Sequence, residues 1–252
     1  ALVPSLVFGV AMGNTLIGVP YSFDADLRVS YTGNLFGLLN PFALVAGVVS
    51  VAMLLGHGAL YLCLKTDSLI RERSRTVAAF AWLGAVAAYA LAGLWLWAGF
   101  DGYAVSNLAL DGPSNPLRKT IEPIAGQFFQ NFVDTPWLLI APVVGLAGGL
   151  IAVALTYLRA FGTAFLVSKL AIGGIIASVG CALFPIILPS STHLSHSLTV
   201  FDSSSSEATL WIMLLCTAVF LPLIVVYTGW VYRVLWGKVT EDDIQTHSKS
   251  LY

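Results

Sequence analysis

The stretch WIMLLCTAVFLPLIVVY, residues 211–227, contains no charged side chain and lies within an apolar run over 210–236. An α-helix needs about 20 mostly apolar residues to cross the hydrocarbon core of a bilayer. The polar segment PSSTHLSHSLTVFDSSSS, residues 189–206, stands just before this run, and the apolar CALFPIILP leads into that segment. This order predicts two membrane-spanning helices joined by a loop outside the membrane.

The whole chain has the composition of an integral membrane protein. Of its 252 residues, 58% are hydrophobic and only 10% are charged, whereas a soluble globular domain carries about 25% charged residues. The net charge of −1 argues against a nucleic acid or an acidic polymer as a partner. We expect neither a disulfide framework nor a zinc site, because three cysteines lie singly inside apolar runs: Cys63, Cys181 and Cys216.

Five runs are long and apolar enough to span a membrane, which predicts an all-α polytopic membrane protein. They cover residues 40–64, 77–100, 137–158, 163–188 and 210–236. Residues 1–19 form a shorter apolar run and indicate the end of a preceding transmembrane helix, so we expect Ala1 to be an internal point of a longer protein. The predicted division is therefore a helix end at 1–19, an outer loop at 20–39, a five-helix transmembrane region at 40–236 and a cytoplasmic tail at 237–252.

The charges of the loops predict the orientation of the spans. If the spans alternate, eight cations fall on one side: Lys65, Arg71, Arg73, Arg75, Arg159, Arg233, Lys238 and Lys249. The opposite loops hold only Arg28, Arg118 and Lys119 against a majority of acids. Cytoplasmic loops carry an excess of Lys and Arg, so the first side and the C-terminus are predicted to be cytoplasmic.

Small residues and one amphipathic segment predict how the spans pack. Gly145-x-x-x-Gly149 and Gly173-x-x-x-Ala177 lie on consecutive predicted helices, and this spacing lets helix backbones approach closely in lipid. In the long outer loop, apolar residues recur with helical periodicity from Ile121 onward. We therefore expect an amphipathic outer-loop helix near 121–133, lying on the membrane or on the helix bundle.

The polar segment 189–206 admits three interpretations. His193, His196 and Asp202 could form part of a metal-ligand set, and Ser190 or Ser191 with His193 could act as a hydrolase. The metal set has no third His or Cys near it, and the chain has no Gly-x-Ser-x-Gly nucleophile elbow. The segment is therefore best interpreted as a solvated loop.

The ionisable side chains at membrane depth are His57 and Lys169, and no Asp or Glu lies centrally in a complete span. Ion and proton pathways in membranes are usually marked by buried carboxylates or paired charges. Haem ligation by two histidines would need two facing residues at similar depth. We therefore predict structural roles for His57 and Lys169, no catalytic, cofactor-binding or metal-binding residue, and a scaffold or partner subunit.

Several long motifs resemble subunit II of cytochrome bd-type ubiquinol oxidases. The first is GNTLIGVPYSFDADLRVSYTGNLFGLLNPFALVAGVVS at residues 13–50. Shorter ones follow in order to the end of the chain: FDGYAV, SNPL, FPIILPSSTHLSHSLTVFDSSSSEATL, YTGWVYRVLWGKVTEDDI and HSKSLY.

The resemblance implies a non-haem structural and assembly subunit of a bacterial inner-membrane oxidase that couples quinol oxidation to reduction of dioxygen to water and generates a proton gradient. It implies haem b and haem d in a partner, subunit I, and a structural quinone or lipid in subunit II, and it leaves open a small single-helix subunit. Family members have two four-helix bundles and an extra helix. This chain matches the second bundle and the extra helix, with the end of a preceding helix, and the first bundle is absent.

An alternative from another class is half of a secondary membrane transporter, because transporter spans also use Gly and Pro breaks. The lack of a polar site at the midplane of the predicted spans argues against it.

Overall fold

The computed structural model describes residues 2–108, 114–234 and 237. The predicted end of the last span at 235–236 and the C-terminal tail, with Lys238 and Lys249, lie outside the described residues. Five helices are long and apolar enough to cross a membrane, over Pro41–Lys65, Leu69–Gly99, Pro136–Tyr157, Phe161–Leu183 and Glu207–Val234. This confirms the predicted all-α polytopic membrane fold. The predicted span at 163–188 is too long at its end, because the helix ends at Leu183 and Ile186–Leu188 form a strand.

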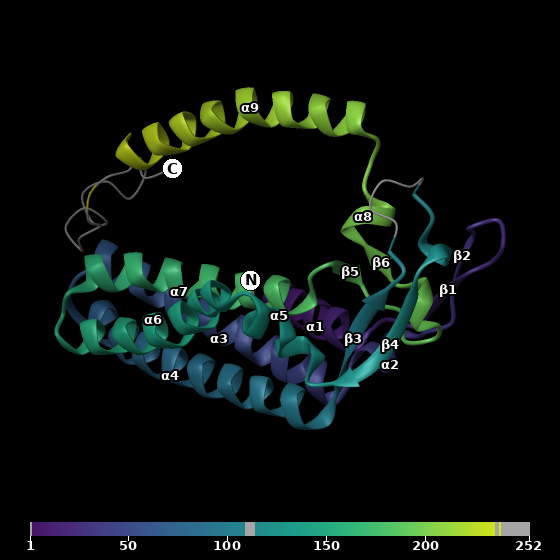
Figure 1. Cartoon of the computed structure of the whole chain (residues 1–252). Coiled ribbons are helices and arrows are strands. Elements are labelled where there is room, and N and C mark those ends of the chain that lie inside the picture. Colours follow the sequence, from purple (N-terminus) through teal and green to yellow (C-terminus); the bar gives the residue numbers. More distant parts are fainter. Residues whose placement is uncertain (1, 109–113, 235–236, 238–252) are drawn as a thin grey trace.

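A four-helix bundle forms the body of the protein (Figure 1). It consists of α3 (Pro41–Lys65), α4 (Ser68–Gly99), α6 (Ile140–Tyr157) and α7 (Phe161–Leu183). Each helix packs against its neighbours in the order α3, α4, α6, α7 and back to α3. The helix that precedes the bundle, α1 (Leu2–Ile17), packs against α3.

The bundle core is centred on Trp82 of α4, which is fully buried. Its indole lies between two glycines of neighbouring helices: a Cβ at Gly56 of α3 would stand 2.7 Å from the ring, and one at Gly149 of α6 would stand 3.2 Å from it. Small residues at these two positions therefore make room for the largest core side chain.

The contact between α6 and α7 depends on Gly145 and Gly174, and it corrects one prediction from the sequence. A Cβ at Gly174 would lie 2.6 Å from the backbone nitrogen of Gly145, so the two backbones nearly touch. Gly173, which was expected to pack, faces open space, and Ala177 is exposed. The spacing alone does not show which of two adjacent glycines faces the neighbouring helix, because both belong to an apolar run.

The last helix, α9 (Glu207–Val234), lies apart from the bundle (Figure 1), and none of its described residues is buried. Helix α4 begins at Ser68 instead of near 77, because a charged first segment extends it beyond the apolar span. This segment carries ion pairs from Arg71 to Asp67 and from Arg75 to Glu72, which stabilise exposed helical turns.

Three two-stranded antiparallel sheets lie at one end of the bundle (Figure 1). They pair β1 (Tyr21–Phe23) with β2 (Val29–Tyr31), β3 (Asp101–Ser106) with β4 (Thr120–Ala125), and β5 (Ile186–Leu188) with β6 (Leu198–Thr199). Short helical segments complete this region, which we call the outer cap: α2 (Leu35–Leu38), η1 (Pro116–Arg118), α5 (Gln127–Asp134), η2 (Pro136–Leu139), η3 (Leu194–His196) and α8 (Val200–Ser203).

The amphipathic helix predicted near 121–133 is wrong in its first half. Residues 120–125 form β4, which pairs with β3 in the register Asp101↔Ala125 to Ser106↔Thr120. The helix begins only at Gln127, after Gly126 with φ of +78°. Pairing with a strand distant in sequence outweighs the local periodicity. The remaining helix, α5, packs on the bundle with Phe128 and Phe132 buried.

Candidate functional site

The segment 189–206 is folded into the outer cap by buried polar contacts. Ser190 is fully buried, its hydroxyl donates to the Tyr21 carbonyl, and its oxygen accepts the backbone N–H of His193 at 3.2 Å. Ser191 and His193 are exposed. These contacts give Ser190 a structural role, and they do not place its hydroxyl against an imidazole as a hydrolase would require.

The two loop histidines lie together, with ring centroids 5.0 Å apart. Nδ1 of His196 accepts the backbone N–H of Phe23 at 3.0 Å, which requires the neutral ring with its proton on Nε2. Burial, with the charges of His193 and Lys119, lowers the pKa of His196 and so favours this neutral form. Within the described ranges, no three His, Cys, Asp or Glu side chains gather as a metal site would need.

Asp202, the third residue of the hypothetical metal set, belongs to a buried ion pair. Its Oδ2 accepts a hydrogen bond from Lys119 Nζ at 2.6 Å, and the two side chains are 7% and 1% exposed. The other oxygen, Oδ1, accepts the N–H of Thr199 at 2.8 Å and completes a capping box at the start of α8. Lys119 Nζ also donates to the Pro116 carbonyl at 2.8 Å. The pair joins the long outer loop, 101–136, to the segment that leads into α9.

Tyr21 ties the first hairpin to the same region. Its hydroxyl donates to the Leu188 carbonyl at 2.7 Å, and burial raises the pKa of Tyr21 to about 12. The phenol therefore remains a hydrogen-bond donor at physiological pH and keeps β1 attached to β5.

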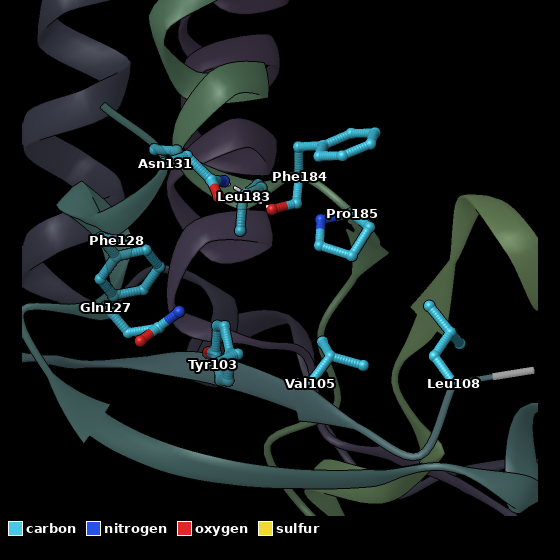
Figure 2. A pocket seen from close by; sticks show the side chains of 10 residues that line it. Tyr103, Val105, Leu108, Gln127, Phe128, Asn131, Leu183, Phe184 and Pro185 are labelled. Atoms are coloured by element: carbon cyan, nitrogen blue, oxygen red, sulfur yellow. Dashed lines mark hydrogen bonds between the residues drawn. The ribbon is translucent and has the colours of Figure 1, made fainter. Parts of the chain in front are cut away.

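A cavity of about 180 Å³ opens beneath β3, between α5 and the end of α7 (Figure 2). Tyr103, Gln127, Asn131 and Phe184 are among its lining residues, and Asn131 Nδ2 donates to the Phe184 carbonyl at 2.6 Å. Most of the lining residues are apolar, but polar atoms make up the larger part of the wall, and the lining residues carry no carboxylate, imidazole or thiol. Such a cavity can hold a small uncharged group. Its one ionisable side chain, Tyr103, donates its hydroxyl to the Leu16 carbonyl at 3.3 Å, and burial raises the pKa of this phenol, so the lining residues offer no base or nucleophile at neutral pH.

Within the membrane-spanning region, His57 and Lys169 both lie against the ring of Phe165. The imidazole of His57 stacks on the Phe165 ring with centroids 4.4 Å apart, and Lys169 Nζ lies 4.4 Å from the centroid of the same ring. Nδ1 of His57 is 2.7 Å from Ser168 Oγ, which itself donates to the Phe165 carbonyl. The serine therefore accepts the Nδ1–H of His57, and both His57 and Lys169 pack against Phe165.

Two features escaped prediction from the sequence. Lys119 was counted only as an outer cation, and nothing in the sequence names Asp202 as its partner, 83 positions away. The cavity is formed by β3, α5 and residues 182–185 at the end of α7, and neither the strand nor the turn at Phe184–Pro185 was predicted. The spacing of Thr199 and Asp202 was a usable signal for a capping box at the start of a helix, but it does not identify Lys119 as the partner of that carboxylate.

Comparison with known proteins identifies the family. The family model described as cytochrome bd terminal oxidase subunit II matches residues 1–235. The chain is 42% identical over 253 residues to cytochrome bd-I ubiquinol oxidase subunit 2 of Escherichia coli K12, covering 100% of this chain and 67% of that protein. It is 41% identical over 251 residues to a probable cytochrome oxidase subunit 2 of Haemophilus influenzae, covering 99% and 66%.

A solved structure supports the same fold. The bd oxidase from Geobacillus thermodenitrificans aligns with a TM-score of 0.59 at 17% identity, covering 93% of this chain and 60% of that one. The chain thus spans about two thirds of the length of its sequence relatives and less of this structural one. These comparisons give no support to the transporter alternative. With this match over residues 1–235, the chain belongs to the family of cytochrome bd terminal oxidase subunit II.

Proposed function

We propose that this chain is the structural and assembly subunit of a quinol oxidase that couples quinol oxidation to reduction of dioxygen to water and generates a proton gradient. The observation that carries the proposal is the 42% identity, along the whole chain, to a ubiquinol oxidase subunit. The five apolar helices support a place in the bacterial inner membrane, where subunit I is the partner. A structural quinone or lipid in this subunit and a small single-helix third subunit belong to the same proposal.

We assign haem b and haem d to the partner, because the described residues of this chain do not fit a haem. His193 and His196 lie in the outer cap, and His196 already accepts a backbone N–H through Nδ1. His57 is the one histidine on a span among the described residues, so no facing histidine at similar depth is present there to ligate a haem with it. What this chain supplies is a rigid bundle and cap against which a haem-bearing subunit can assemble.

We also propose that the end of the bundle opposite the outer cap is cytoplasmic. Arg159, in the turn between α6 and α7, pairs with Glu72 of α4 at 3.0 Å. This ion pair supports placing the two basic connections, α3 to α4 and α6 to α7, at the same end of the bundle. The excess of cations there favours the cytoplasmic side. The acidic loops, with the three sheets, then face the outside.

Purification of the native complex through a tag on this chain tests the function. We expect haem-bearing subunit I to co-purify, and the complex to consume oxygen when quinol is added. A complex that lacks haem and oxygen uptake, but moves a solute across vesicles, would favour the transporter alternative.

A further inference from the structure

Lys169 is a cation on a membrane-spanning helix, and no anionic side chain pairs with it among the described residues. It lies eight residues after Phe161, the first residue of α7, which is about 12 Å along the helix axis. Its ammonium group lies over the ring of Phe165, one turn closer to the basic end of the bundle. The side chain therefore turns back toward that end, as lysines do when they reach for the polar boundary of a bilayer.

The ring beneath Lys169 continues into a row of aromatic side chains that ends at a second lysine. Phe165 contacts Tyr61 of α3 with ring centroids 5.8 Å apart. Lys65 Nζ lies 6.0 Å from the centroid of Tyr61. Two cations from different helices, Lys169 and Lys65, thus lie at the two ends of one row formed by Phe165 and Tyr61. We call these four residues the lysine–aromatic row.

The surroundings of the lysine–aromatic row suit a phosphate with acyl chains attached. In the connections at this end, five cations face two acids, a net charge of +3 before Lys169 is added: Lys65, Arg71, Arg73, Arg75 and Arg159 against Asp67 and Glu72. Glu72 is already paired with two arginines. Beside Lys169, Leu166 and Leu170 are 60% and 64% exposed, which gives acyl chains an apolar surface. Basic residues at the cytoplasmic boundary attract anionic lipid headgroups.

We propose that the lysine–aromatic row binds one anionic phospholipid, with Lys169 contacting the phosphate, Lys65 adding positive charge, and an acyl chain lying along Leu166 and Leu170. This rests on the proposed cytoplasmic position of this end of the bundle. A lipid fits better than an acidic side chain of another helix, because Lys65 is the last residue of α3 and the side chain of Lys169 turns back toward the same end of the bundle. There they meet the headgroup layer rather than the bilayer centre.

Native mass spectrometry of the purified complex tests the site, with phosphatidylglycerol and phosphatidylcholine of equal chain length as the probes. We expect Lys169→Leu to weaken phosphatidylglycerol binding about tenfold, which is what loss of one charge-assisted phosphate contact removes. Lys169→Arg should keep the lipid. Arg73→Gln is the matched control, because it removes an exposed cation from the same end without touching the row, and it should change binding less than about twofold.

Three results would overturn the proposal. The first is that Lys169→Leu binds phosphatidylglycerol as tightly as the unchanged complex does. The second is that the unchanged complex binds phosphatidylcholine as tightly as phosphatidylglycerol, and the third is that millimolar inorganic phosphate displaces the lipid. Loss of the partner subunit from Lys169→Leu, with lipid binding intact, would show instead that a protein carboxylate occupies the lysine. Quinol-driven oxygen uptake, measured in the same preparations, reports separately on the oxidase assignment.

Discussion

Replacing Lys119 by Met should open the outer cap, because it leaves the Asp202 carboxylate buried without its cation. In the intact protein the carboxylate has two partners, the ammonium group at 2.6 Å and the N–H of Thr199 at 2.8 Å. The substitution removes the charged partner and keeps a side chain of similar length. Asp202 is only 7% exposed, so water cannot replace the lost partner without opening the cap.

The expected cost is about 3–5 kcal/mol, the usual penalty for breaking a buried ion pair on one side. At the lower limit, the population of the locally opened cap rises about a hundredfold or more. The double variant Lys119→Met with Asp202→Asn removes both charges and retains an oxygen that can accept the N–H of Thr199. It should recover most of the loss, because no unpaired charge then remains in the cap.

Proteolysis of the intact complex from the outer side measures this opening. When opening and closing are fast relative to cleavage, the rate follows the population of the open form. Arg118→Gln is the matched control, because Arg118 is the exposed neighbour of Lys119 and should leave the cleavage rate unchanged. Cleavage of Lys119→Met as slow as in the unchanged protein, or of the double variant as fast as in the single one, would refute the reasoning.

Further predictions concern packing, pH and orientation. Gly174→Ala should lower the yield of assembled complex through about 1–3 kcal/mol of overpacking, whereas Gly173→Ala, facing open space, should not; equal yields would contradict the assigned helix face. The neutral ring of His196 holds the first hairpin by accepting the N–H of Phe23, and the pKa of this ring is lowered in the folded protein. The stability from this contact is therefore complete above the unfolded pKa of about 6.5 and is lost as pH falls through the folded pKa. Cleavage of that hairpin should therefore rise at acid pH, and His196→Ala should abolish this dependence; a dependence that survives would assign it to another group. Cysteines at Arg73 and Ser205 should react with membrane-impermeant reagents from opposite sides of sealed vesicles, and labelling from one side only would disprove the proposed orientation.

The sequence predicts the membrane-spanning part of this fold well, because length and apolar character are local properties. Each of the five spans overlaps one of the apolar runs, although the run at 163–188 also includes β5. The outer cap could not be predicted in the same way, since each strand depends on a partner outside its own segment, as β3 and β4, separated by residues 107–119, show. The helix period from Ile121 is present in the sequence, but pairing with β3 decides the structure of residues 120–125.

The arrangement of the cap explains how a helix with no buried residue can still have a defined starting point. Residues 204–206 alone separate α8 from α9. The capping box of α8 uses Asp202, whose other oxygen is held by Lys119 from the long outer loop. The buried ion pair therefore fixes the outer end of α9 relative to the bundle, while its apolar surface is left for lipid or for another part of the oxidase. Since lipid tails provide no hydrophobic force between helices, a polar anchor at the end of the helix is an effective way to hold it in place.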